Sequence, residues 1–308
     1  MGKICFFCGS NNTTKKGFAH GHQRWLCKAC YRYFSQPKRD STEQIHELYA
    51  SGRFCANDIA KHLGVSRSTV TRAIKAFKPA PLQVPPSKVV AMLDTSYWGR
   101  EFGVVAIKDS ISGRFLWSKF ITRKERVEDY IEGIRHLVSK GFQIAGVVSD
   151  GLRGLREALA SYNFQHCQFH QVKTIKHWLT SHPKLDASRE LLRLAYFMRK
   201  TDKASFVGLF NEWEAKWTPF LKERSIGADG KSRYVHKNLR SAYHSLKRNM
   251  RYLWTFEDCW GQGIPNTNNG IEAAFGDLKS LLRRHKGISI DRRKALILEY
   301  FSGHNPYK

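Results

Sequence analysis

Two Cys-x-x-Cys pairs near the start of the chain constrain its fold more than any other feature. Cys5 and Cys8 form the first pair, Cys27 and Cys30 the second, and 18 residues separate the pairs. Four thiolates at this spacing can surround one Zn²⁺ ion, which supplies folding free energy that so short a segment lacks. Two disulfides are the alternative, which an intracellular setting disfavours. The spacing predicts a zinc ribbon over residues 1–38 with one structural Zn²⁺.

The charge of the chain indicates a polyanionic partner. The sequence has 52 Lys and Arg against 26 Asp and Glu, a net charge of +26, which points to nucleic acid. Basic and aromatic residues crowd the second cysteine pair, where Arg24 is expected to contact phosphate. At 42% hydrophobic residues a packed core is expected, and a mainly disordered chain is excluded. No apolar run reaches the roughly 18 residues of a spanning helix, and the first residues lack a signal-peptide pattern, so we expect no membrane partner.

Residues 39–78 carry the pattern of a helix-turn-helix. Ser41 can cap a first helix, Gly64 supports the turn between the next two, and Ser66 can cap the last. The outward positions of this last helix are expected to enter the major groove of DNA; they are Arg67, Ser68, Thr71, Arg72 and Lys75. A plain helical hairpin with a solvated polar face is the alternative.

A proline-rich segment follows and marks a domain boundary. Four of the nine prolines fall within residues 79–86, a density that neither a helix nor a central strand tolerates. We expect a linker over residues 79–87 and a separate domain over residues 88–308.

Two apolar runs in this second domain each lead to an aspartate. Residues 88–93 precede Asp94, and residues 144–149 precede Asp150, as expected of strands buried on both faces. Further strands are predicted at 102–107 and 115–121, and a helix at 124–140. Two such strands can bring their carboxylates to one sheet edge, where oxygen ligands suit Mg²⁺. Either aspartate alone could be a helix cap or a turn residue; the repeated context favours the metal site.

A third carboxylate is expected from a later helix. Asn268 or Asn269 can cap a helix whose apolar stripe has Glu272 beside it, near the helix start. There Glu272 could reach a metal; Asp277, further along, is the alternative. Lys279 and Arg283 share the face of Glu272, seven and eleven residues further along, with Gly276 leaving space for a DNA backbone. They are expected to bind phosphates, unless this face is a solvated basic stripe.

These elements together resemble bacterial insertion-sequence transposases of the Mutator-like branch of the DDE superfamily. The resemblance covers nearly the whole chain, and the Cys-x-x-His element is its most branch-specific part. The matching pieces are Gly21–Cys27, Leu93-Asp94-Thr95, Val148-Ser149-Asp150-Gly151, Cys167-Gln168-Phe169-His170 and Thr267–Glu272. The resemblance implies an α/β RNase H-like catalytic domain with an all-helical insertion at about 171–265, behind the zinc ribbon and the helix-turn-helix.

The resemblance also implies the chemistry. Asp94, Asp150 and Glu272 would hold two Mg²⁺ or Mn²⁺ ions, one activating water and later the freed 3′-hydroxyl, the other stabilising the leaving oxygen. Cys167 and His170 would support this site; ordinary packing for Cys167 and a hydrogen bond for His170 are the alternatives. The implied partners are double-stranded DNA, as element ends and as target, and further copies of the chain on DNA. The implied location is the nucleoid in a prokaryotic cytoplasm.

The function predicted from the sequence is that of a DNA transposase, which binds the terminal repeats of its element and joins their 3′-hydroxyls to target DNA. One alternative is an RNase H-like nuclease or resolvase without strand transfer. Another is a zinc-ribbon and helix-turn-helix regulator with an inactive catalytic domain.

Overall fold

The computed structural model describes residues 3–5, 7–19, 22–35, 42–51, 54–79, 81–285 and 287–303. The chain forms two compact units, Met1–Lys78 with Leu281–Leu296, and Pro79–Ser280 with Ile297–Lys308. The expected boundary at residue 38 and the expected cap Ser41 lie outside the described residues. In the described part of the chain, no helix combines the length and the apolar character that crossing a membrane requires.

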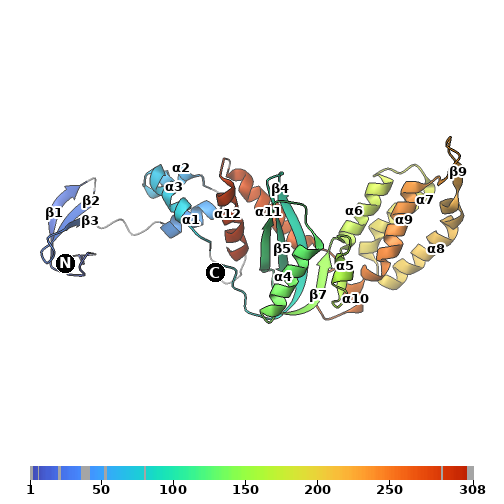
Figure 1. Ribbon diagram of the computed structural model, residues 1–308, viewed down its shortest axis with the longest axis horizontal. Helices are drawn as coiled ribbons and strands as arrows, with labels where there is room; N and C mark the ends of the chain where they lie inside the picture. The colour runs from blue at the N-terminus through green and yellow to red at the C-terminus, as the bar shows by residue number, and fades with distance from the viewer. Residues whose placement is uncertain are drawn as a thin grey trace. The chain divides into compact units, whose positions relative to one another are not determined.

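The first unit begins with a small antiparallel sheet. Its strands are β1 (Thr13–Ala19), β2 (His22–Cys27) and β3 (Tyr33–Ser35), in the order β1-β2-β3 (Figure 1). Trp25 on β2 pairs with Phe34 on β3, and both rings pack on the buried Cys5 and Cys27. Among the described residues, cysteine side chains and two aromatic rings make up this core, which is too small to hold a fold alone.

Three helices follow in the first unit. They are α1 (Thr42–Ala50), α2 (Ala56–Leu63) and α3 (Arg67–Ala76). Gly64 ends α2 with φ +62°, a conformation that glycine adopts without strain. The Ser66 hydroxyl accepts the Thr69 backbone N–H at 3.1 Å and so caps α3. Residues far along the chain complete this group, since the ring of Tyr49 lies 4.3 Å from that of His285.

The second unit is built on a five-stranded mixed sheet. Its strands are β4 (Lys88–Trp98), β5 (Phe102–Asp109), β6 (Phe115–Ile121), β7 (Gln143–Ser149) and β8 (Phe164–His166). Their order is β6-β5-β4-β7-β8, with β4, β5 and β6 antiparallel and β4, β7 and β8 parallel. The expected mixed α/β, multidomain architecture is thereby confirmed.

Helices cover both faces of this sheet. On one face, α4 (Val127–Ser139) packs Ile134 and Leu137 onto Leu93 and Ile107 (Figure 1). On the other face, Phe115 stacks on Phe301 of α12 (Ile290–Gly303) at 4.0 Å. It also lies 6.4 Å from Phe275 of α11 (Asn269–Arg284). The alternating side chains of each central strand are therefore buried on both sides, as the continuous apolar runs predict.

Strand β4 is longer than expected. It continues through Asp94 to Trp98, because antiparallel pairing with β5 extends from Ala91↔Asp109 to Trp98↔Phe102. The last parallel pair with β7 is Met92↔Val148. Asp94 therefore lies inside a strand, but just beyond its parallel neighbour.

A helical segment with its own core follows β8. Its helices are α6 (Gln168–Leu179), α7 (Asp186–Phe197), α8 (Lys203–Lys222) and α9 (Lys237–Asn249). A short hairpin, β9 (Arg224–Ile226) with β10 (Ser232–Tyr234), interrupts the expected all-helical pattern; its turn contains Gly230 at φ +71°. The segment is closed at its base, since the Gln168 N–H donates to the Asn266 carbonyl at 3.0 Å. The Asn266 amide donates in turn to Gln168 Oε1 at 3.2 Å.

Candidate catalytic and metal sites

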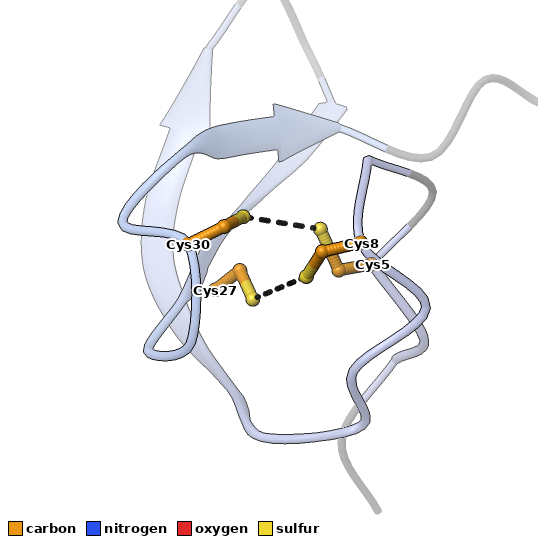
Figure 2. Close-up of side chains that lie close together, drawn as sticks. All are labelled: Cys5, Cys8, Cys27 and Cys30. Carbon is orange, nitrogen blue, oxygen red and sulfur yellow. Dashed lines mark hydrogen bonds between the residues drawn. The ribbon is translucent and has the colours of Figure 1, made fainter.

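The four cysteines Cys5, Cys8, Cys27 and Cys30 bring their sulfurs together. Their Sγ atoms all lie within 4.8 Å of one another, with Cys5 and Cys30 at 3.7 Å and Cys8 and Cys27 at 3.5 Å (Figure 2). A disulfide would need about 2.05 Å. Four sulfurs at about 2.3 Å from one Zn²⁺ ion would lie about 3.8 Å apart. The group can therefore hold a zinc ion.

The two cysteine turns repeat one backbone pattern. The Cys5 N–H donates to the Ser10 carbonyl at 2.8 Å, and the Cys27 N–H donates to the Arg32 carbonyl at 3.0 Å. Directly after the second cysteine of each pair the backbone is left-handed, at Gly9 with φ +73° and at Tyr31 with φ +53°. Two matched turns facing each other present their sulfurs to a common centre.

The parallel pairing of β4, β7 and β8 ends near one level of the sheet, on the face covered by α11. Met92 pairs with Val148, and Val148 pairs with Gln165. Two residues further on, the first two strands reach Asp94 and Asp150, and β8 leads to Cys167. Side chains two apart on a strand share a face, and neighbouring strands are about 4.8 Å apart. The sheet thus brings Asp94 and Asp150 side by side, with Cys167 next in the row.

Asn268 places the third carboxylate over this row. Its side-chain N–H donates to the Leu93 carbonyl at 2.8 Å, and its backbone N–H donates to Cys167 Sγ at 3.2 Å. Its own carbonyl accepts the N–H of Glu272 at 3.3 Å at the start of α11. Asn268 is fully buried. One residue therefore joins the strand of Asp94, the strand of Cys167 and the helix of Glu272.

The charges of the other two carboxylates act on Asp94. Burial, and after it the charge of Asp150, raises the pKa of Asp94 to about 8, and Glu272 and Glu125 contribute to the rise. The Thr95 N–H, which donates to Asp94 Oδ1 at 2.8 Å, opposes this shift. Asp277, the alternative third acid, is exposed and instead acts on Lys108 and Tyr300.

A second ligand group shares Glu272. The Cys167 Sγ, a His170 ring nitrogen and a Glu272 carboxylate oxygen all lie within 4.8 Å of one another. His170 Nδ1 and Glu272 Oε1 are 3.4 Å apart, and in the described part of the chain neither atom has a hydrogen-bond partner. Burial raises the pKa of the Cys167 thiol, against the backbone N–H groups of Asn268 and His170. The Cys-x-x-His element therefore meets the Glu272 helix directly, at the N-terminus of α6 rather than on a strand.

The sequence reasoning missed a polar pair beside Asp94. The Tyr130 hydroxyl donates to Glu125 and lies 2.8 Å from the Thr95 hydroxyl. Burial, then the charge of Glu125, raises the pKa of Tyr130. Glu125 is therefore a fourth acid near Asp94. It lies in the loop before α4 and follows no apolar strand, which is the signal that identified Asp94 and Asp150.

Gly151, after Asp150, has a close contact that only glycine permits. Its φ is +94°, and a Cβ there would lie 2.2 Å from Cε1 of His166. His166 is buried, and burial lowers its pKa to about 4, with the charges of His170 and Arg156 adding to the effect. A neutral imidazole therefore fills the space under the Asp150 loop.

The expected DNA-contacting side chains lie mostly on the surface. Arg67, Ser68, Arg72 and Lys75 on α3 are exposed and Thr71 is half-buried. Arg24 is exposed, with its guanidinium 4.0 Å over the Tyr33 ring. Lys279 is half-buried, with Nζ 5.9 Å over the Trp98 ring, and Arg283 is exposed.

No protein-family model matches the chain, and no match was found among curated proteins. Among solved structures, a Drosophila P element transposase strand transfer complex is similar at 13% identity and a TM-score of 0.44. The alignment covers 88% of this chain and 94% of that chain.

Proposed function

We propose that this protein is a DNA transposase that cuts and joins DNA strands with divalent metal ions. The proposal rests on the convergence of three carboxylates, those of Asp94, Asp150 and Glu272. Asp150 and Glu272 lie close enough to Asp94 that their charges raise its pKa. Carboxylates that lie close enough to repel one another are stabilised by a cation between them.

The ligand chemistry fits Mg²⁺ or Mn²⁺. All three groups offer oxygen, and Glu272 Oε1 is buried without a hydrogen-bond partner in the described part of the chain. Such ions, when bound, would activate the attacking water or 3′-hydroxyl and stabilise the leaving oxygen. Asp94 and Asp150 would hold them from adjacent strands, and Glu272 from the rigid start of α11. His170 would orient Glu272, and Lys279 and Arg283 would bind flanking phosphates.

The first unit supplies DNA recognition in this proposal. Arg67, Ser68, Thr71, Arg72 and Lys75 would enter the major groove, and Arg24 of the zinc ribbon would bind phosphate. The resemblance to Mutator-like insertion-sequence transposases supports the finer assignment: terminal repeats as the bound ends, other double-stranded DNA as the target, and several copies of the chain on DNA.

The test is a cleavage assay with candidate end DNA and Mg²⁺. Asp94→Asn, Asp150→Asn and Glu272→Gln should each abolish nicking and leave DNA binding intact, since each removes one charged ligand at nearly constant shape. Asp277→Asn is the matched control and should stay active. Nicking above about a tenth of wild type in any of the three removes that residue from the metal site.

The products separate the related functions. Joined products identify a transposase, whereas nicking alone would indicate a nuclease or resolvase. Binding without nicking, at any divalent ion tested, would indicate a DNA-binding regulator.

A further inference from the structure

A groove begins beside Asp150 and passes into the helical segment. Its first part is a cavity of about 610 Å³ whose lining includes Asp150, Arg153, Arg156 and Arg248. Glu157 is the other acid in this lining, and it pairs with Arg156 at 2.7 Å. The groove therefore starts at a proposed catalytic carboxylate, and apart from the Arg156–Glu157 pair its other charged side chains are basic.

The groove continues along α6 and α9. A second cavity of about 500 Å³ shares Thr174, Ser245 and Arg248 with the first. A third, also of about 500 Å³, shares Trp178 and Lys237 with the second. No acidic side chain lines either of these two cavities.

Basic side chains along α9 form one stripe. Lys237, Arg240, His244 and Arg248 follow at steps of three, four and four residues, so they share a face of the helix. From Lys237 to Arg248 the helix rises about 16 Å, the length of roughly five stacked nucleotides at 3.4 Å each.

Three cations of the groove have no ion-pair partner among the described residues. Within the described ranges, Lys237, Arg153 and Arg248 form no salt bridge, whereas Lys247, outside the groove, pairs with Glu214. Burial, then the charges of Arg240 and Arg248, lowers the pKa of His244. Unpaired like charges on one face destabilise a helix slightly, so a polyanion would stabilise this one.

Two further features suit a nucleic acid strand. Trp178 is 37% exposed and lines both the second and the third cavity, where a base could stack on it. Arg240 is held in place, since it donates to the Leu221 carbonyl at 2.7 Å and lies 3.5 Å over the Tyr234 ring. Each cavity is of the size that holds a drug-sized molecule, which suits one or two nucleotides rather than the full width of a duplex.

We propose that this groove binds single-stranded DNA, with its phosphates along α9 and a base on Trp178, and leads that strand to or from the catalytic carboxylates. The path of the strand to or from the carboxylates rests on the proposed function, whereas the binding of single-stranded DNA does not.

The first test measures binding of an oligothymidine of about 20 nucleotides to the full chain without Mg²⁺ or Mn²⁺, over a range of KCl concentrations. Lys237→Ala with Arg248→Ala removes two phosphate contacts and should flatten the log-affinity against log-salt slope by about 1.4. The matched control is Lys176→Ala with Lys222→Ala, two exposed cations of the same segment that line none of the three cavities. Equal flattening in both double variants would overturn the proposal.

The second test locates the strand. Oligothymidine carrying 5-iodouracil should crosslink to Trp178 on irradiation, and Trp178→Leu should remove that crosslinked peptide. Duplex DNA of the same length should compete for this crosslink at least tenfold more weakly than single strands. A crosslink only within the first unit, or equal competition by duplex, would contradict a single-strand groove.

The two proposals fail separately. The proposed cleavage needs Mg²⁺ or Mn²⁺, so binding measured without these ions does not depend on whether Asp94→Asn abolishes nicking. If Asp94→Asn, Asp150→Asn and Glu272→Gln lose nicking but Lys237→Ala with Arg248→Ala keeps the wild-type salt slope, only the single-strand groove is disproved.

Discussion

The backbone N–H of Asn268 donates a hydrogen bond to Sγ of Cys167 at 3.2 Å, across 101 positions of sequence. The same residue donates its side-chain N–H to the carbonyl of Leu93, directly before Asp94. Asn268 therefore joins the Cys-x-x-His element, the strand of Asp94 and the Glu272 helix, and this joint helps to position Glu272 relative to Asp94.

We predict that Asn268→Asp lowers nicking by about 10- to 100-fold with little effect on DNA binding. The substitution keeps the size of the side chain but removes the donor to the Leu93 carbonyl and places a negative charge against it. Asn269→Asp is the control, because Asn269 is exposed at the first position of α11; it should behave like wild type. Cleavage rates at saturating DNA check both. Full activity of Asn268→Asp would show that the joint does not position Glu272.

Purified protein should contain one equivalent of zinc, and Cys27→Ser should lose it. Cys27 is fully buried among the four sulfurs, so its loss leaves three ligands and an open core. Cys55→Ser, at an exposed cysteine outside the group, should keep the zinc. Metal analysis with circular dichroism is the measurement. Zinc retained in Cys27→Ser would disprove the site.

Acid should destabilise the second unit through Asp129. The Arg123 guanidinium, bidentate at 2.8 Å, holds the pKa of this buried carboxyl down to about 2, and Lys119 adds to the effect. Because the pKa is lower in the folded state, the stabilisation is complete above the ordinary value near 4 and is lost between about pH 4 and pH 2; it amounts to about 2 kcal/mol.

Asp129→Asn should therefore lower the free energy of unfolding by about 2 kcal/mol at pH 7 and flatten its change between about pH 4 and 2. Urea unfolding followed by tryptophan fluorescence at each pH gives the numbers. Glu132→Gln, at the exposed partner of Lys119, should cost less than about 0.5 kcal/mol. A wild-type pH profile in Asp129→Asn would rule out this residue as the source.

Gly151→Ala should destabilise the second unit by at least about 2 kcal/mol and impair cleavage. Both the left-handed backbone and the clash with His166 contribute. His166→Ala in the same chain should restore only the part due to the clash. Gly208→Ala, in α8 with nothing within 4 Å of the added Cβ, should be neutral or stabilising by up to about 1 kcal/mol. Unfolding by urea distinguishes these cases, and a neutral Gly151→Ala would contradict the packing.

The sequence predicted the features that depend on local pattern. Continuous apolar runs predicted the strands that lead to Asp94 and Asp150, because both faces of these strands are covered. The cysteine spacing predicted the four-sulfur group. The capping of α3 by Ser66 also follows from a local signal.

Other features depend on contacts that leave no local pattern. The link from Asn268 to Leu93 spans 175 positions, and the grouping of Leu281–Leu296 with the first unit depends on packing such as Tyr49 on His285. Glu125 lies in the loop before α4, and no sequence pattern predicts that this loop brings it near Asp94. The continuation of β4 past Asp94 required the register with β5.

The paired hydrogen bonds between Gln168 and Asn266 have an evolutionary consequence. They bring the entry and the exit of the helical segment together, and the segment has a hydrophobic core of its own. Helices or hairpins between Gln168 and Asn266 could therefore be gained, lost or exchanged without shifting the strands that lead to Asp94 and Asp150. Such a chain can acquire new substrate preferences in one part while its chemistry stays unchanged in another.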